Sequence, residues 1–142
     1  MSTVTYYFNA YGAEQWTDPG NMTDGLLTSY ASTASKTQVQ LLNANDCPGT
    51  DLGSISAVEL RVYAYGDGDD TILLRPVFGG SADGNDHSVT PGTSGAWSAY
   101  QDITNDPNAP GSWGWSDVQG LDCDVEFATT AKGNTMYAAK VE

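Results

Sequence analysis

The stretch Ile55-Ser-Ala-Val-Glu-Leu-Arg-Val-Tyr-Ala-Tyr65 decides the fold class of this 142-residue chain. From Val58 onward, apolar residues occupy every second position, and the positions between them are charged or aromatic. A period of two is the pattern of a β-strand that has one face in the core and one face toward solvent. The pattern therefore predicts a strand over Ile55–Tyr65, with Val58, Leu60, Val62 and Ala64 pointing inward and Glu59, Arg61, Tyr63 and Tyr65 pointing outward.

Shorter stretches of the same kind lie on both sides of this one, whereas helical periodicity is nearly absent. Many short strands joined by loops rich in Gly, Asn, Asp and Pro are typical of all-β sandwiches. The sequence therefore predicts an all-β fold, an antiparallel β-sandwich (jelly roll) of about seven to nine strands, as a single domain over residues 1–142. The other expected strands are Val4–Asn9, Gln38–Asn43, Thr71–Phe78, Ser98–Ile103, Cys123–Thr129 and Thr135–Glu142.

Two local features refine the strand over Thr71–Phe78. The turn that precedes it, Gly66-Asp-Gly-Asp-Asp70, predicts a hairpin with the strand over Ile55–Tyr65. Pro76 lacks the N–H that a central strand would use, so it predicts an edge strand or a bulge.

If the predicted strands share one sheet, alternation gathers their outward side chains on a single mixed face. In the last strand, Tyr137, Ala139 and Val141 are expected to point inward. The mixed face is either a solvated surface held by cross-strand ion pairs or a groove for sugar hydroxyls, and the sequence leaves both open. Its expected members are Glu59, Arg61, Tyr63, Arg75, Asp124, Glu126 and Lys140.

The tryptophans are the second indication of a sugar ligand. Trp113 and Trp115 lie in the loop Gly111-Ser-Trp-Gly-Trp-Ser116, and Trp97 lies at the start of a strand. Flat aromatic rings can stack on the C–H side of a pyranose, while carboxylates and guanidinium groups bind its hydroxyls. For each tryptophan, packing over an open end of the sandwich is the alternative. The predicted carbohydrate-binding residues are Trp113, Trp115, Trp97, Tyr63, Tyr65, Arg61, Arg75, Glu59 and Glu126.

The charge balance excludes several partners. With 18 Asp and Glu against 5 Lys and Arg, the formal net charge is −13, which argues against nucleic acid because phosphate binding needs clustered cations. No apolar stretch approaches the ~20 residues of a membrane span, so no membrane insertion is expected. Met1–Ala10 has neither the charged nor the hydrophobic region of a signal peptide. The acidic composition nevertheless favours an extracellular or virion-surface location.

We expect no catalytic activity, because the sequence has one histidine and no nucleotide-binding or zinc-protease motif. One enzymatic alternative remains. A glycoside hydrolase needs two carboxylates about 5–10 Å apart across a groove, and Glu59 and Glu126 are predicted on one face of separate strands.

Two further sites follow from residue type. Asp67, Asp69 and Asp70 offer oxygen ligands for a structural Ca²⁺, although aspartate and glycine are also ordinary turn residues. No other cofactor is expected. Cys47 and Cys123 form no CxxC motif and have no histidine nearby, so they are either a disulfide or two buried thiols.

The order of several motifs resembles a family of β-sandwich domains in phage, viral and bacterial surface proteins. These motifs are Trp16-Thr-Asp-Pro19, Thr23-Asp-Gly25, Tyr30-Ala31, Pro48-Gly49 before Ile55–Val62, the Trp97 segment, Trp113-Gly-Trp115, Val125-Glu-Phe127 and the strand Tyr137–Glu142.

That resemblance implies a jelly roll of the kind shared by many carbohydrate-binding modules, and a non-catalytic protein that recognises polysaccharide or cell-surface glycan. The first alternative is a viral structural protein of the capsid-decoration or tail type, for which a homo-oligomer with buried tryptophans would be expected. The second alternative is a small jelly-roll glycoside hydrolase. Because unrelated functions share this fold, the resemblance bears more on architecture than on ligand.

Overall fold

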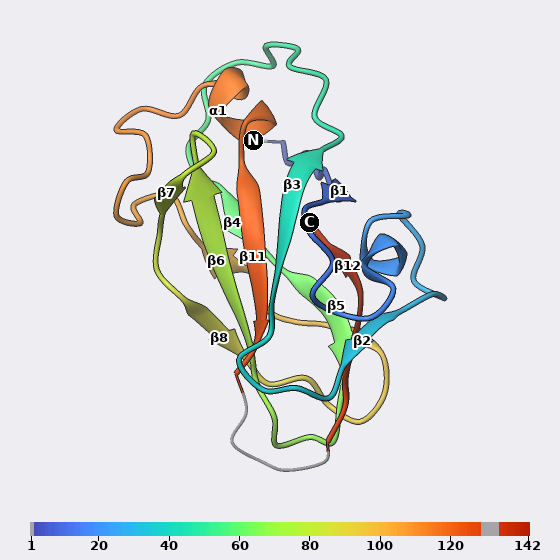
Figure 1. Ribbon diagram of the computed structural model, residues 1–142. Helices are drawn as coiled ribbons and strands as arrows, with labels where there is room; N and C mark the ends of the chain where they lie inside the picture. Colours follow the sequence, from blue (N-terminus) through green and yellow to red (C-terminus); the bar gives the residue numbers. More distant parts are fainter. Residues whose placement is uncertain (1, 129–133) are drawn as a thin grey trace.

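The computed structural model describes residues 2–128 and 134–142, which form two large antiparallel sheets and a separate two-stranded pair (Figure 1). The β11 sheet has the strand order β1 (Phe8–Tyr11), β3 (Val39–Asn45), β11 (Asp122–Phe127), β6 (Ile72–Phe78) and β7 (Ala82–Asp83), and β8 (His87–Val89) also pairs with β6. The β12 sheet has the order β2 (Ala31–Thr33), β12 (Met136–Val141), β5 (Val62–Tyr65) and β9 (Ala96–Trp97). β4 (Glu59–Leu60) pairs with β10 (Gln101–Asp102). The antiparallel β-sandwich predicted from the sequence is confirmed.

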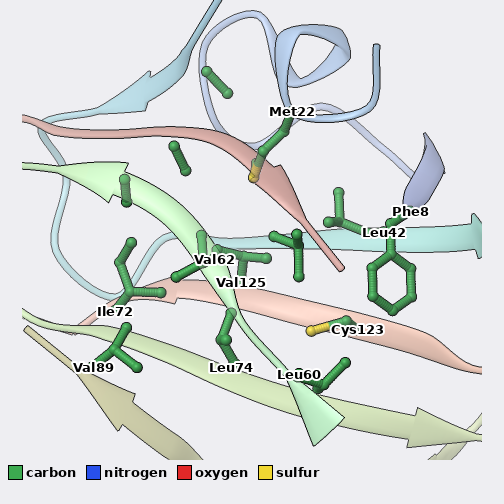
Figure 2. Close-up of a cluster of buried hydrophobic side chains, with 14 of the residues drawn as sticks. Phe8, Met22, Leu42, Leu60, Val62, Ile72, Leu74, Val89, Cys123 and Val125 are labelled. Carbon is green, nitrogen blue, oxygen red and sulfur yellow. The ribbon is translucent and has the colours of Figure 1, made fainter. Parts of the chain in front are cut away.

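The core lies between the two sheets, and Figure 2 shows side chains from both of them in contact. Leu74, Cys123 and Val125 come from the β11 sheet, and Val62 comes from β5 on the other side. These positions are the inward set of each strand, as the alternation predicts. The short elements η1 (Pro19–Met22) and α1 (Trp115–Gln119) are the helical segments among the described residues.

The turn over residues 66–70 does not form the predicted hairpin. β5 belongs to the β12 sheet and β6 to the β11 sheet, so the turn carries the chain from one sheet to the other. Each strand pairs instead with a strand from the end of the sequence: β6 pairs with all six residues of β11, and β5 pairs with β12. Turn chemistry is local, whereas partner choice depends on burying both inward faces, and here the long-range pairing prevails.

Pro76 lies in a strand with neighbours on both sides, so the predicted edge position is wrong. β6 pairs with β11 on one side, while the other side pairs first with β8 and then with β7. The Pro76 carbonyl accepts a hydrogen bond from Gly84 N at 2.9 Å on this second side. The N and C=O of one residue point to the same side of an antiparallel strand. The missing N–H of Pro76 therefore falls between β8 and β7 and leaves the pairing with β11 intact.

A register shift in β12 changes which of its residues point outward. Ala138 is opposite Ala64, but Lys140 is opposite Tyr63, so Ala139 is the extra residue of a β-bulge. Before the bulge, Met136 and Ala138 are buried and Tyr137 is outside; after it, Val141 is buried and Lys140 is outside. The predicted inward position of Tyr137 is wrong, because strict alternation cannot anticipate a bulge.

Candidate functional site

The outer surface of the β12 sheet carries a cluster of partly exposed aromatic rings, which we call the aromatic face. Because Val62 and Ala64 point into the core, alternation turns the residues beside them on β5 outward. Trp97 on β9 and Tyr137 on β12 add rings at the matching positions, and Tyr30 directly precedes β2. The aromatic face consists of Tyr30, Tyr63, Tyr65, Trp97 and Tyr137.

Two groups of ring contacts hold this surface in place. Tyr65 and Tyr137 are opposite each other on β5 and β12 and stack with centroids 4.5 Å apart at an interplanar angle of 8°. Tyr30 meets both of them edge-on, at 5.0 and 6.4 Å. Tyr63 is opposite Trp97 and meets it edge-on at 5.4 Å. Each such contact contributes about 0.5–1.5 kcal/mol beyond area burial, so the rings form a preorganised surface.

The Tyr30 hydroxyl of this surface is protonated at neutral pH. The pKa of Tyr30 is raised above its ordinary value near 10, first by desolvation and then by the neighbouring Tyr63 and Tyr65 and a hydrogen bond with Tyr63. A protonated phenol both donates and accepts hydrogen bonds. The face therefore presents flat apolar rings together with hydroxyl groups.

Two cations border the aromatic face. The Arg61 guanidinium carbon lies 4.0 Å from the ring centroid of Trp97 and 4.5 Å from that of Tyr100, whose side chain is 44% exposed. Lys140 Nζ lies 4.9 Å from the ring centroid of Tyr7 and 6.0 Å from that of Trp97. These distances place both cations within cation–π range.

A single buried carboxylate, that of Glu142, holds both cations. Its side chain is 5% exposed, its Oε1 accepts a hydrogen bond from Arg61 Nε at 2.6 Å and also pairs with Arg61 Nη2, and its Oε2 lies 3.7 Å from Lys140 Nζ. One carboxylate thus joins the two cations that border the face.

Three of the four tryptophans use their indole N–H group in a hydrogen bond within the protein. Trp16, Trp113 and Trp115 donate through Nε1 to the backbone carbonyls of Gln38, Thr104 and Gly53 at 2.9–3.0 Å. Trp97 is half-buried, and its N–H has no hydrogen-bond partner among the described residues. Beside it, a cavity of about 250 Å³ is lined in part by Ser98, Thr90 and Gln101.

The structure brings four of the predicted site residues together, Tyr63, Tyr65, Trp97 and Arg61, but it places Arg75 and Glu126 in the other sheet. Sequence reasoning missed Tyr30, which precedes a strand of only three residues, and Tyr137, which the bulge turns outward. It also assigned no role to Glu142. A Tyr-x-Tyr pattern facing a second aromatic strand was the available signal.

The single mixed face predicted from alternation is wrong, because its members lie in different sheets. Arg75 and Glu126 belong to the β11 sheet. Arg75 Nη2 pairs with Asp124 at 2.9 Å, while its Nε lies 3.8 Å from Asp83 and its Nη1 lies 3.9 Å from Asp86. The hydrogen bond to Asp124 raises the pKa of Arg75. This is the cross-strand ion-pair alternative.

Glu59 and Glu126 are also apart in the fold. Glu59 lies on β4 and is exposed, whereas Glu126 lies on β11 in the other sheet. The hydrolase alternative depended on both carboxylates lying on one outward face, and the structure does not provide that face.

Trp113 and Trp115 occupy different environments at one end of the sandwich. Trp113 is buried, with its ring edge-on to Phe78 at a centroid distance of 5.8 Å, so it is a core residue. Trp115 is half-buried and borders an open depression of about 500 Å³ together with Asp51 and Ser54.

The aspartate loop is held by its own hydrogen bonds, and the two cysteines are not bonded to each other in the structure. Asp67 Oδ1 accepts hydrogen bonds from the backbone N of Asp69 and Asp70 at 3.0 and 3.1 Å, and the bond from Asp69 is the largest cause of a lowered Asp67 pKa. Within residues 2–128 and 134–142, no group of three or more His, Cys, Asp or Glu side chains is placed to hold a metal ion. Cys47 and Cys123 are both buried, free thiols.

No helix in the described part of the chain is long and apolar enough to cross a membrane.

Comparisons with known proteins found a distant structural likeness. No protein-family model matches the chain, and no curated protein matches it. A solved structure described as "CBM4 structure and function" is similar, with 12% sequence identity, coverage of 80% of this chain and 78% of that chain, and a TM-score of 0.47. A likeness this distant transfers neither a ligand nor site residues to this chain.

Proposed function

We propose that this domain is a non-catalytic carbohydrate-binding module that holds a polysaccharide or cell-surface glycan on the aromatic face. The observation that carries the proposal is the gathering of Tyr30, Tyr63, Tyr65, Trp97 and Tyr137 on one outer sheet surface, bordered by Arg61 and Lys140. Structural packing alone does not require five aromatic rings outside the core of so small a domain.

The chemistry of the face suits a sugar chain. The C–H side of a pyranose stacks on aromatic rings, while phenol hydroxyls, the Trp97 N–H and the planar guanidinium of Arg61 can bond to sugar hydroxyls. Four adjacent strands span roughly 15 Å, which is wider than one sugar ring, so the open face accommodates a length of chain. An open site of this kind gives affinities in the micromolar to millimolar range, about 4–8 kcal/mol.

Affinity electrophoresis tests the proposal directly. The protein is run on native gels that contain xylan, β-glucan or mannan, beside the Trp97→Ala variant and the control variant Glu126→Gln, which alters the outer surface of the opposite sheet. We expect retardation by at least one polymer, a loss of affinity of about tenfold or more for Trp97→Ala, and no change for the control. Absence of retardation on every polymer and on a glycan array would refute the proposal.

Different measurements test the two alternative functions, a glycoside hydrolase and a viral structural protein. Release of reducing sugar from the same polymers would establish a hydrolase. A viral structural role was expected to bury the tryptophans, yet Trp97 and Trp115 are both partly exposed. A viral or bacterial surface setting is supported by the sequence resemblance, and the oligomeric state in solution would test it.

A further inference from the structure

The depression beside Trp115 lies apart from the aromatic face. Trp115 begins α1, which Figure 1 shows at one end of the sandwich, whereas the aromatic face covers the outer surface of the β12 sheet. The depression has a volume of about 500 Å³ and is walled on its other side by the segment that carries Asp51, Gly53 and Ser54.

The indole at this depression is held in one position. Trp115 Nε1 donates to Gly53 O at 2.9 Å, which ties the start of α1 to a loop 62 residues earlier in the sequence. Beneath it, Trp113 is fixed by the bond from its Nε1 to Thr104 O at 3.0 Å and by its contact with Phe78. A partly exposed ring that is already immobilised loses little conformational entropy when a ligand stacks on it.

The polar groups around the ring are those that bind sugar hydroxyls. Asp51 supplies a carboxylate, and Ser54 and Ser116 supply hydroxyl groups. Gly53 has a φ of +104°, a backbone conformation suited to glycine. Because Gly53 has no side chain, the space beside it at the edge of the depression is open. One ring, one carboxylate and two hydroxyls match a single sugar residue rather than an extended chain.

We infer that the depression bordered by Trp115, Asp51, Ser54 and Ser116 is a second saccharide site, which takes one sugar ring such as the end of a glycan chain. The inference rests on the proposed function for its class of ligand, but not on the aromatic face for its location. Two separate sites would let one domain hold a chain end and the body of a chain, or two chains.

Nuclear magnetic resonance of the indole N–H groups distinguishes the two sites. In ¹⁵N-labelled protein, the Trp97 and Trp115 resonances are assigned with Trp97→Phe and Trp115→Phe and then followed during titration with xylo-, cello- and manno-oligosaccharides. We expect both resonances to shift, with different concentration dependences. Asp51→Asn, which keeps the side-chain shape, should weaken the Trp115 titration about fivefold and leave the Trp97 titration unchanged.

Each of the other possible results contradicts either the second site, the proposed function or both. A shift of Trp97 alone refutes the second site and retains the proposed function. A shift of Trp115 alone retains the second site and refutes binding on the aromatic face. Equal affinities at both resonances, both weakened by Asp51→Asn, refute the separation of the sites. No shift with any oligosaccharide refutes both.

Discussion

Gly95 lies directly against two rings of the aromatic face. A Cβ at this position would lie 2.6 Å from the Tyr30 hydroxyl and 2.9 Å from Tyr63 Cε1, distances at which the rings must move. We expect Gly95→Ala to weaken polysaccharide binding about tenfold while changing the unfolding temperature little, because the displaced groups are partly exposed side chains. Affinity electrophoresis and thermal unfolding measure the two effects.

Gly92 provides the matched control for this substitution. It lies in the same loop, and an added Cβ would have no heavy atom within 4 Å. Gly92→Ala should therefore leave binding unchanged. Wild-type affinity for Gly95→Ala would show that the positions of Tyr30 and Tyr63 do not matter for the ligand.

At the residue level, the sequence predicts the site in part. Alternation along residues 58–65 was enough to turn Tyr63 and Tyr65 outward, and a loop-flanked strand start was enough to select Trp97. Tyr137 could not be found in this way, since one bulge residue reverses the face of β12. For Trp113 the sequence left a ligand contact and packing at the end of the sandwich both open, and the structure buries its ring in the core beside Phe78.

At the level of elements, Glu142 connects the end of β12 to Arg61, the residue directly before β5. The backbones of Glu142 and Arg61 exchange two hydrogen bonds, at 2.9 and 3.0 Å, and their side chains form the buried ion pair. We expect Glu142→Gln, which removes the charge but keeps the shape, to lower the free energy of unfolding by about 1–3 kcal/mol, because both cations lose their counter-charge. Urea unfolding measures this change.

Glu59→Gln is the control for the loss of a carboxylate. Glu59 is exposed on β4, and replacing an exposed side chain should change stability by no more than about 0.5 kcal/mol. If Glu142→Gln proved as stable as the control, the ion pair would contribute nothing to the attachment of β12.

The strands themselves were largely predictable, but their partners were not. Expected and observed strands overlap for β1, β3, β5, β6, β11 and β12, because hydrophobic alternation is a local property. Sheet membership depends on which inward faces meet across the core, and the turn over residues 66–70 carried no information about that. This is why the predicted mixed face divides into an ion-paired surface on the β11 sheet and an aromatic surface on the β12 sheet.

Considered as a whole, the molecule should protect both of its thiols. Cys123 lies at the centre of the core with 0% exposure, where burial raises its pKa and disfavours the reactive thiolate, and Cys47 is 5% exposed. We expect an aromatic disulfide reagent to label neither cysteine in the native protein and both after denaturation. The labelling rate should follow unfolding in urea.

The same measurement decides between the two alternatives for the cysteines. Two thiols per denatured chain would agree with the free cysteines of the structure. No reactive thiol, even in denaturant without reductant, would show that Cys47 and Cys123 form a disulfide in the isolated protein.

The order in which strands fill the two sheets has a consequence for folding kinetics. β11 lies between β3 and β6, and β12 lies between β2 and β5, so the last two strands that the structure describes complete the middle of both sheets. Until they are in place, four earlier strands lack a partner along one edge, and loop-closure entropy over long stretches of sequence has to be paid first. Folding of such a topology is slow, on the order of milliseconds to seconds, and its unpaired edges are the points at which growing chains would associate wrongly.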